Sequence, residues 1–262
     1  MSSLILPAYT AVMILYLTSP VIVMILYGFN NIPGDRQTPR FFGFTLNWYR
    51  QIFAVPGLTD ALRNSLIIAV TAAVIATILG TFLGLALGRY VFRGKAAMNF
   101  VIFLAIAVPE IVLGSSLLVL FVQWRVQLGL PSILLSHVAF GTPFVAVTVQ
   151  ARVAGMDRSL EDAAYDLYAR PVAAFRHVTL PQILPGVFAG FLLALVLSLD
   201  DFVITQFVSG PTQTFPIWVF GATRVGLPPQ VNVMGTLLFA IGLAVALGNL
   251  VSRRRKLGGG AT

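Results

Sequence analysis

The chain has 262 residues, of which 58% are hydrophobic and 10% are charged, and it contains no cysteine. Soluble domains carry about 25% charged residues, so this composition predicts an integral membrane protein and excludes disulfides, thiolate metal sites and cysteine nucleophiles. The formal net charge of +8 comes from Lys and Arg at the ends of apolar runs and in short loops, which indicates membrane topology rather than nucleic-acid binding.

Six apolar segments are each long enough to cross a bilayer, which takes about 20 predominantly apolar residues. The segments cover residues 4–29, 64–88, 97–122, 132–150, 183–206 and 233–252. Residues 1–34 carry no charged side chain, unlike a signal peptide with a basic start, so we interpret the first segment as a retained span. The sequence therefore predicts an all-α, polytopic fold with six transmembrane helices in a single transmembrane domain of residues 1–262.

The basic residues predict the orientation of these spans. Positive charge gathers in cytoplasmic loops, and 11 of the 17 Lys and Arg residues fall on the side that carries both termini. These are Arg89, Arg93, Lys95, Arg152, Arg158, Arg170, Arg176, Arg253, Arg254, Arg255 and Lys256. We therefore expect both termini, and the loop between the fourth and fifth spans, to be cytoplasmic.

The second predicted span has a small residue at every fourth position, which places these residues on one helix face. They are Ala72, Ala76, Gly80, Gly84 and Gly88. Such a face lets another helix backbone approach closely. We favour packing inside this chain over a dedicated dimerisation face.

The loop between spans four and five, about residues 151–182, contains the stretch "MDRSLEDAAYDLYARPVAAFRHVTLPQILPG" at 156–186. Its composition predicts two short helices. Ser159 followed three residues later by Asp162 resembles a capping box, and Pro171 suits the first turn of a second helix. Taken alone, the loop could be an amphipathic connector that lies on the membrane surface.

The same loop resembles the EAA loop of ABC-importer permeases, with the spacing of that pattern kept throughout. The matching positions are Asp162, Ala163 and Ala164 for EAA, Tyr168 for the Gly, Val178 for the Ile, and Leu180 with Pro181 for the Leu-Pro pair. In that family the loop forms coupling helices that seat in a groove of a separate ATPase. The resemblance gives this role to residues Glu161 to Pro181.

Two positions depart from the family pattern. Asp162 stands where the family has Glu, which is a mild change. Tyr168 stands where the family has Gly, and a bulky residue tolerates a left-handed turn poorly. Either the turn is built differently here, or the Tyr168 ring adds a contact to the ATPase.

Three acids fall within predicted spans and are candidates for a translocation pathway or its outer gate: Glu110, Asp200 and Asp201. A carboxylate at mid-bilayer costs about 2.5 to 3.5 kcal/mol, so each should face a cavity, water or a partner. Adjacent helical positions diverge by about 100°, and we expect one of the two aspartates to be structural. Glu110 follows Pro109 and could cap a restarted helix instead of lining a pathway. We interpret His137 as a packing residue and His177 as a surface residue.

The segments "VPEIVLGSSLL" at 108–118, "DRSLEDAA" at 157–164 and "SLDDFVITQFVSGP" at 198–211 resemble the second permease subunit of spermidine/putrescine importers. This resemblance implies a small cationic solute and a place in the bacterial cytoplasmic membrane. It also implies a second permease of similar fold, two copies of an ABC ATPase and an extracytoplasmic binding protein. ATP and Mg²⁺ would be bound by the ATPase, and this chain would bind no cofactor of its own.

The residues agree with a transport subunit that has no catalytic site. Neither Lys95 nor Lys256 ends a Gly-rich phosphate loop, and no zinc motif or G-x-S-x-G elbow is present. Three alternatives remain open on sequence alone. They are an ABC permease for another small solute, an ion-coupled secondary transporter that uses the buried acids, and a membrane-embedded enzyme or scaffold.

Overall fold

The computed structural model describes residues 2–34, 36–157 and 159–258. Over these ranges the chain is helical and has no β-strand, apart from an isolated antiparallel bridge between Asn30 and Phe44. This confirms the all-α prediction. The chain divides into two compact units, one of residues 1–59 with 219–262 and one of residues 60–218. The side chains of the basic cluster at 253–256, and Arg158, lie outside the described part of the chain.

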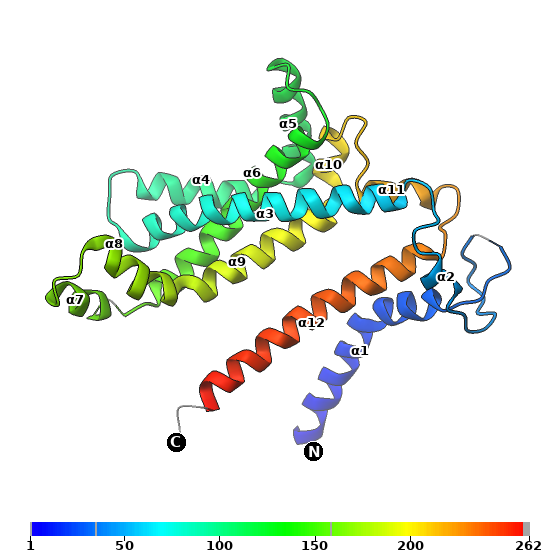
Figure 1. The fold of residues 1–262 in the computed structure, drawn as a ribbon, viewed down its shortest axis with the longest axis horizontal. Helices are drawn as coiled ribbons and strands as arrows, with labels where there is room; N and C mark the ends of the chain where they lie inside the picture. Colours follow the sequence, from blue (N-terminus) through cyan, green and yellow to red (C-terminus); the bar gives the residue numbers. More distant parts are fainter. Residues whose placement is uncertain (1, 35, 158, 259–262) are drawn as a thin grey trace. The chain divides into compact units, whose positions relative to one another are not determined.

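The unit of residues 60–218 contains the predicted loop and all three acids. Its helices are α3 (Leu58–Arg89), α4 (Lys95–Ala107), α5 (Glu110–Gln123), α6 (Leu130–Ala154), α7 (Ser159–Asp166), α8 (Pro171–Ala174), the π-helix η1 (Phe175–Thr179), α9 (Leu180–Asp200) and α10 (Val203–Val208). Helices α7 and α8 lie at one end of this unit, and α5 and α10 lie at the other (Figure 1).

Helix α6 is the central element of this unit, and α3 packs against it through its glycines. A Cβ atom added to Gly80 would lie 2.6 Å from the Cβ of Val145, and one added to Gly84 would lie 2.6 Å from the carbonyl oxygen of Ala146. Gly88 meets Val153 in the same way, at 2.8 Å. The small-residue face of α3 therefore serves packing inside the chain, as predicted.

Helix α9 packs on another side of α6, again through glycines. A Cβ atom on Gly190 would lie 3.0 Å from Val145, and one on Gly186 would lie 2.7 Å from the Cβ of Arg152. The apolar core at this junction is formed by buried side chains of α3, α6 and α9. They are Ala73, Ala76, Leu85, Val145, Val149, Val153, Ile183 and Ala194.

Within the described residues, four helices are long and apolar enough to cross a membrane by length and composition. They are Ile5–Gly28, Leu58–Arg89, Leu130–Ala154 and Pro171–Asp200. Helices α4 and α5 make a fifth candidate if they are counted together. The described apolar part of α12 (Gln230–Gly258), which covers Gln230–Ala244, is shorter. These helices make the chain a multi-pass membrane protein, while the full set of six spans stays a prediction.

Two of the predicted spans are interrupted. The span predicted over 97–122 is two helices that meet at a 104° bend, because Pro109 disfavours a helical conformation at the residue before it. The span predicted over 183–206 ends at Asp200, since Asp201 is extended, with φ −62° and ψ 119°, and a new helix starts at Val203.

The unit of residues 1–59 with 219–262 is built on α1 (Ser2–Gly28), α2 (Asn47–Arg50) and α12 (Gln230–Gly258). Its connecting loop is ordered around Asn30, which is 1% exposed. The side chain of Asn30 donates to the carbonyl of Arg40 at 2.7 Å and accepts from the N–H of Phe42 at 2.7 Å. Helix α11 (Phe215–Thr223) spans the boundary between the two units.

The contact between α3 and α6 predicts a steep cost for any side chain at Gly84. Gly84→Ala would place a Cβ against backbone, which cannot move aside, so we expect a loss of about 1 to 3 kcal/mol and a lower Tm in detergent. Gly242→Ala is the matched control, because no atom lies within 4 Å of a Cβ at that helical glycine. An equal Tm for both variants would contradict the packing argument.

Candidate functional site

Helix α7 begins at Ser159, whose backbone N–H donates to Oδ1 of Asp157 at 2.9 Å. Asp157 thus supplies an acceptor for a backbone N–H of the first turn. The capping box predicted from Ser159 and Asp162 stays a prediction. The hydrogen bonds from the backbone and side chain of Ser159 hold the pKa of Asp157 below its ordinary value, which keeps a negative charge at the positive end of the helix.

The turn after α7 keeps a left-handed residue although Tyr168 occupies it. Tyr168 has φ 58°, its N–H donates to the carbonyl of Tyr165 at 2.9 Å, and the N–H of Ala169 donates to the carbonyl of Ala164 at 3.0 Å. These two bonds make a Schellman motif, which usually places Gly at this position. The Tyr168 side chain is 96% exposed, so it makes little contact with its own chain.

The other predicted loop positions lie on successive elements around this turn. Asp162 and Ala163 are exposed on α7, whereas Ala164 is half-buried. Val178 belongs to η1, and Leu180 and Pro181 begin α9.

Several large apolar side chains of the loop point away from the chain. Leu167 is 82% exposed and Val172 is 76% exposed. We call the exposed apolar residues of this loop the docking surface. Its members are Leu160, Tyr165, Leu167, Tyr168, Val172 and Phe175.

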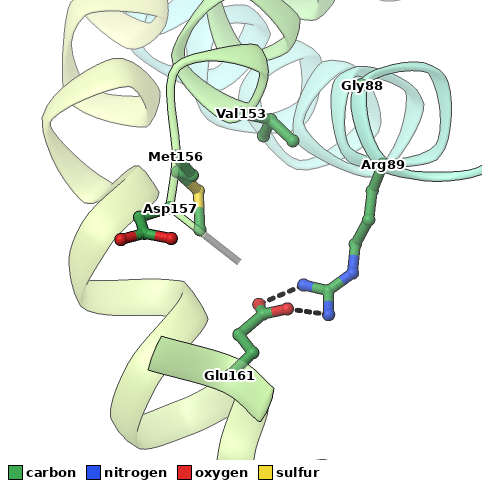
Figure 2. A pocket seen from close by; sticks show the side chains of 6 residues that line it. All are labelled: Gly88, Arg89, Val153, Met156, Asp157 and Glu161. Atoms are coloured by element: carbon green, nitrogen blue, oxygen red, sulfur yellow. Dashed lines mark hydrogen bonds and ion pairs between the residues drawn. The ribbon is translucent and has the colours of Figure 1, made fainter. Parts of the chain in front are cut away.

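Glu161 is the exception in this loop, because its side chain points inward and is only 6% exposed. Its carboxylate pairs with the guanidinium of Arg89 at the end of α3 and also accepts from the hydroxyl of Thr179, the last residue of η1. Figure 2 shows both arms of the ion pair beside Gly88 and Val153. The structure thus joins α7, α3 and η1 at a single carboxylate.

At the other end of the unit, Asp201 lies in the break between α9 and α10 and is 7% exposed. Its Oδ2 accepts from the N–H and the hydroxyl of Thr205, at 2.8 and 2.6 Å. Its Oδ1 faces the N–H of Ile204 at 3.3 Å. Asp201 therefore caps the start of α10.

His137 of α6 completes the network around Asp201. Its Nε2 lies 2.9 Å from the Thr205 hydroxyl and 3.2 Å from Oδ2 of Asp201, and its Nδ1 lies 2.6 Å from the Ser198 hydroxyl. A neutral imidazole with its proton on Nε2 satisfies every contact, because Ser198 then donates to Nδ1. His137 is a buried packing residue, as expected, and it also fixes the helix break by hydrogen bonds.

Asp200 has a different environment from its neighbour, because its side chain is exposed. Glu110, the first residue of α5, is exposed as well and lies within electrostatic range of both aspartates. The two helix breaks meet because α5 packs on α10 where Gly114 approaches Ile204 and Phe207. The structure thus brings the three predicted acids together, with one carboxylate buried and two exposed.

Comparison with known proteins decides the family. The family described as "Binding-protein-dependent transport system inner membrane component" matches residues 80–254, which include both ends of the unit described above. The chain belongs to this family. It is a permease subunit of an ABC importer, and a multi-pass membrane protein. Membership leaves the ion-coupled transporter, the enzyme and the scaffold without support.

Individual relatives match over most of the chain. The spermidine/putrescine transport system permease protein PotC of Haemophilus influenzae is 39% identical over 249 residues, covering 94% of this chain and 96% of its own. The putrescine transport system permease protein PotI of Escherichia coli K12 is 38% identical over 239 residues, covering 87% and 83%. A solved bacterial ABC transporter for import of the polysaccharide alginate shares the fold, with a TM-score of 0.68 at 13% identity and coverage of 96% and 95%.

Sequence reasoning missed four of the residues that organise these sites: Arg89, Thr179, Ser198 and Thr205. One signal was available, because Ser198, Asp201 and Thr205 are spaced by three and four residues and so share a helix face. That spacing favours Asp201 over Asp200 as the inward-facing member. No local pattern links Arg89 to Glu161, since 72 residues separate them.

Proposed function

We propose that this permease forms half of the translocation pathway of an ATP-driven polyamine importer, for a solute such as spermidine or putrescine. The observation that carries the proposal is 39% and 38% identity, over most of the chain, to relatives named for these solutes. Polyamines carry several ammonium groups, which need carboxylates or aromatic faces to replace their water. The two exposed acids supply such groups.

The proposed importer contains this chain as one transmembrane domain of residues 1–262 with six spans. It further contains a second permease of similar fold, two copies of an ABC ATPase that bind ATP and Mg²⁺, and an extracytoplasmic binding protein. The importer lies in the bacterial inner membrane with both termini of this chain in the cytoplasm. The basic residues of the sequence support this orientation.

The coupling role is assigned to the loop that contains α7, α8 and η1. A groove of the ATPase would cover the docking surface, whose six large side chains otherwise expose apolar area to water. The EAA-like residues around it set the shape of the loop: Asp162, Ala163 and Ala164 on α7, Tyr168 in the turn, and Val178, Leu180 and Pro181 where η1 leads into α9.

Glu110 and Asp200 are assigned to the pathway, and Asp201 is assigned to holding the helix break. Helix α9 has 21 residues from Leu180 to Asp200, which corresponds to about 30 Å, the thickness of a hydrocarbon core. Asp200 therefore belongs near the outer membrane surface when the loop is cytoplasmic. An exposed carboxylate at this depth can attract an incoming cation before the pathway opens inward.

The proposal is tested by reconstituting the complex with its ATPase and its binding protein in proteoliposomes. We expect spermidine or putrescine to stimulate ATP hydrolysis and to accumulate inside only when ATP is hydrolysed. An ATPase variant that cannot hydrolyse ATP is the control. Accumulation that persists with that variant, or stimulation by an uncharged solute but by no polyamine, would contradict the proposal.

Substitution of the adjacent aspartates separates their roles. We expect Asp200→Asn to lower polyamine uptake by about tenfold, the effect of losing about 1.4 kcal/mol of binding to a cation, with an unchanged Tm. Asp201→Asn weakens a buried network, so we expect it to lower the Tm of the permease. Uptake assays and thermal unfolding in detergent measure the two effects. If both variants had the same uptake and the same Tm, the assignment of Asp200 to the pathway and of Asp201 to the helix break would be incorrect.

Tyr168→Gly tests whether the docking turn has the geometry usual in the family. Gly adopts a left-handed conformation without a Cβ penalty, so we expect this variant to co-purify with the ATPase as well as wild type does. Tyr168→Pro is the contrasting control, because Pro fixes φ near −65° and removes the N–H of the Schellman motif. We expect it to lose the ATPase. Loss of the ATPase from the Gly variant would mean that the ring, rather than the turn, dominates docking.

A further inference from the structure

The carboxylate of Glu161 lies where three elements of the loop region meet. It belongs to α7, pairs with Arg89 at the end of α3, and accepts from Thr179 at the end of η1. Glu161 is 4% exposed and Thr179 is 2% exposed. A buried carboxylate held in this way resists displacement, because moving it away from the guanidinium would leave charge uncompensated.

Both partners of Glu161 are themselves fixed to the central helix α6. Arg89 follows Gly88, whose backbone lies against Val153. Thr179 leads into α9, where Nε of Arg152 donates to the carbonyl of Gln182 at 2.8 Å. Gly186, one turn further along α9, also packs on Arg152. Glu161 therefore connects α7 to α3 and α9 near the points where each of them contacts α6.

The element that carries Thr179 has an unusual local structure. Residues Phe175–Thr179 form a π-helix between α8 and α9, and such segments occur mostly as single-turn insertions at functional positions. Pro171 begins α8, and Val172 of the same turn belongs to the docking surface. The helix from Pro171 to Asp200 thus links the docking surface, the π-helix and the acid end of the unit.

We propose that Glu161, Arg89 and Thr179 form a joint that transmits movement of the docking surface to α3 and α9. The three are positioning residues, since they lie apart from Glu110 and Asp200 at the proposed pathway. The proposal rests on the proposed function, because it takes the ATPase as the source of the movement. Without the joint, the ATPase still binds the loop and hydrolyses ATP, but its closure no longer drives the helices.

The first test removes the charges of the ion pair one at a time and together. In proteoliposomes we expect Glu161→Gln and Arg89→Gln each to reduce the number of polyamines imported per ATP by about tenfold, within the range for residues in one network. The double variant should be no worse than either single one. Asp166→Asn and Arg93→Gln are matched controls, because they remove the same charges from exposed positions nearby. They should keep the wild-type ratio.

The second test is gentler and guards against variants that fail to fold. Thr179→Val keeps the shape of the side chain but removes its hydroxyl, whereas Thr179→Ser keeps the hydroxyl. We expect the Val variant to import about threefold fewer polyamines per ATP, because it loses one hydrogen bond to a charged group. The Ser variant should keep the wild-type number of polyamines per ATP. If the role of the Thr179 hydroxyl were purely structural, Thr179→Val would change the stability of the permease but not the number of polyamines imported per ATP.

The outcomes separate the joint from the proposed function. Stimulation of ATP hydrolysis by the binding protein is measured in every variant, so the joint is tested even if polyamines prove not to be the solute. The joint is supported if a variant loses the stimulation of ATP hydrolysis by the binding protein but keeps basal ATP hydrolysis and still co-purifies with the ATPase. Wild-type stimulation and transport ratios in all the variants, or equal ratios for Thr179→Val and Thr179→Ser, would overturn it.

Discussion

The close approach of α3 to α6 is the constraint on which the rest of the larger unit depends. Gly80, Gly84 and Gly88 bring the α3 backbone against Val145, Ala146 and Val153. In a bilayer, lipid tails compete equally well for apolar side chains, so association depends on this kind of fitted contact rather than on hydrophobicity. Because α9 packs on α6 as well, through Gly186 and Gly190, one helix sets the positions of both the loop end and the acid end.

Among the described residues of this unit, the two buried carboxylates lie beside helix ends, and both have hydrogen-bond partners. Asp201 fills the break between α9 and α10 with bonds to Thr205 and His137, while Glu161 ties the end of α3 to η1. An unpaired carboxylate at these places would cost several kcal/mol. The same networks that satisfy the carboxylates therefore define the angle at which each helix ends, and they place Asp200 and Glu110 on the exposed side of the breaks.

The sequence was sufficient for features that follow from periodicity or from one residue's chemistry. The spacing of Gly80, Gly84 and Gly88 predicted a close helix contact, and Pro109 marked the interruption in the third span. The helix break at Asp201 was not predicted, because no Pro or Gly lies next to it in the sequence. His137, which stabilises the break, lies 64 residues earlier in the chain. The pairing of Arg89 with Glu161 was missed for the same reason. Contacts between distant residues depend on how helices pack, which hydropathy does not encode.

Tyr168 shows that the surrounding structure can override the backbone preference of a residue. A left-handed Tyr costs about 1 to 2 kcal/mol relative to Gly, yet the Schellman bonds to Tyr165 and Ala164 are both made. The start of α8 at Pro171, three residues further on, leaves the chain little freedom to rearrange the turn. Strain of this kind persists where the surrounding structure over-determines it, and it concentrates at functional sites. The ring is 96% exposed, so contacts of the side chain within its own chain do little to offset this strain, and the backbone hydrogen bonds of the turn hold the conformation.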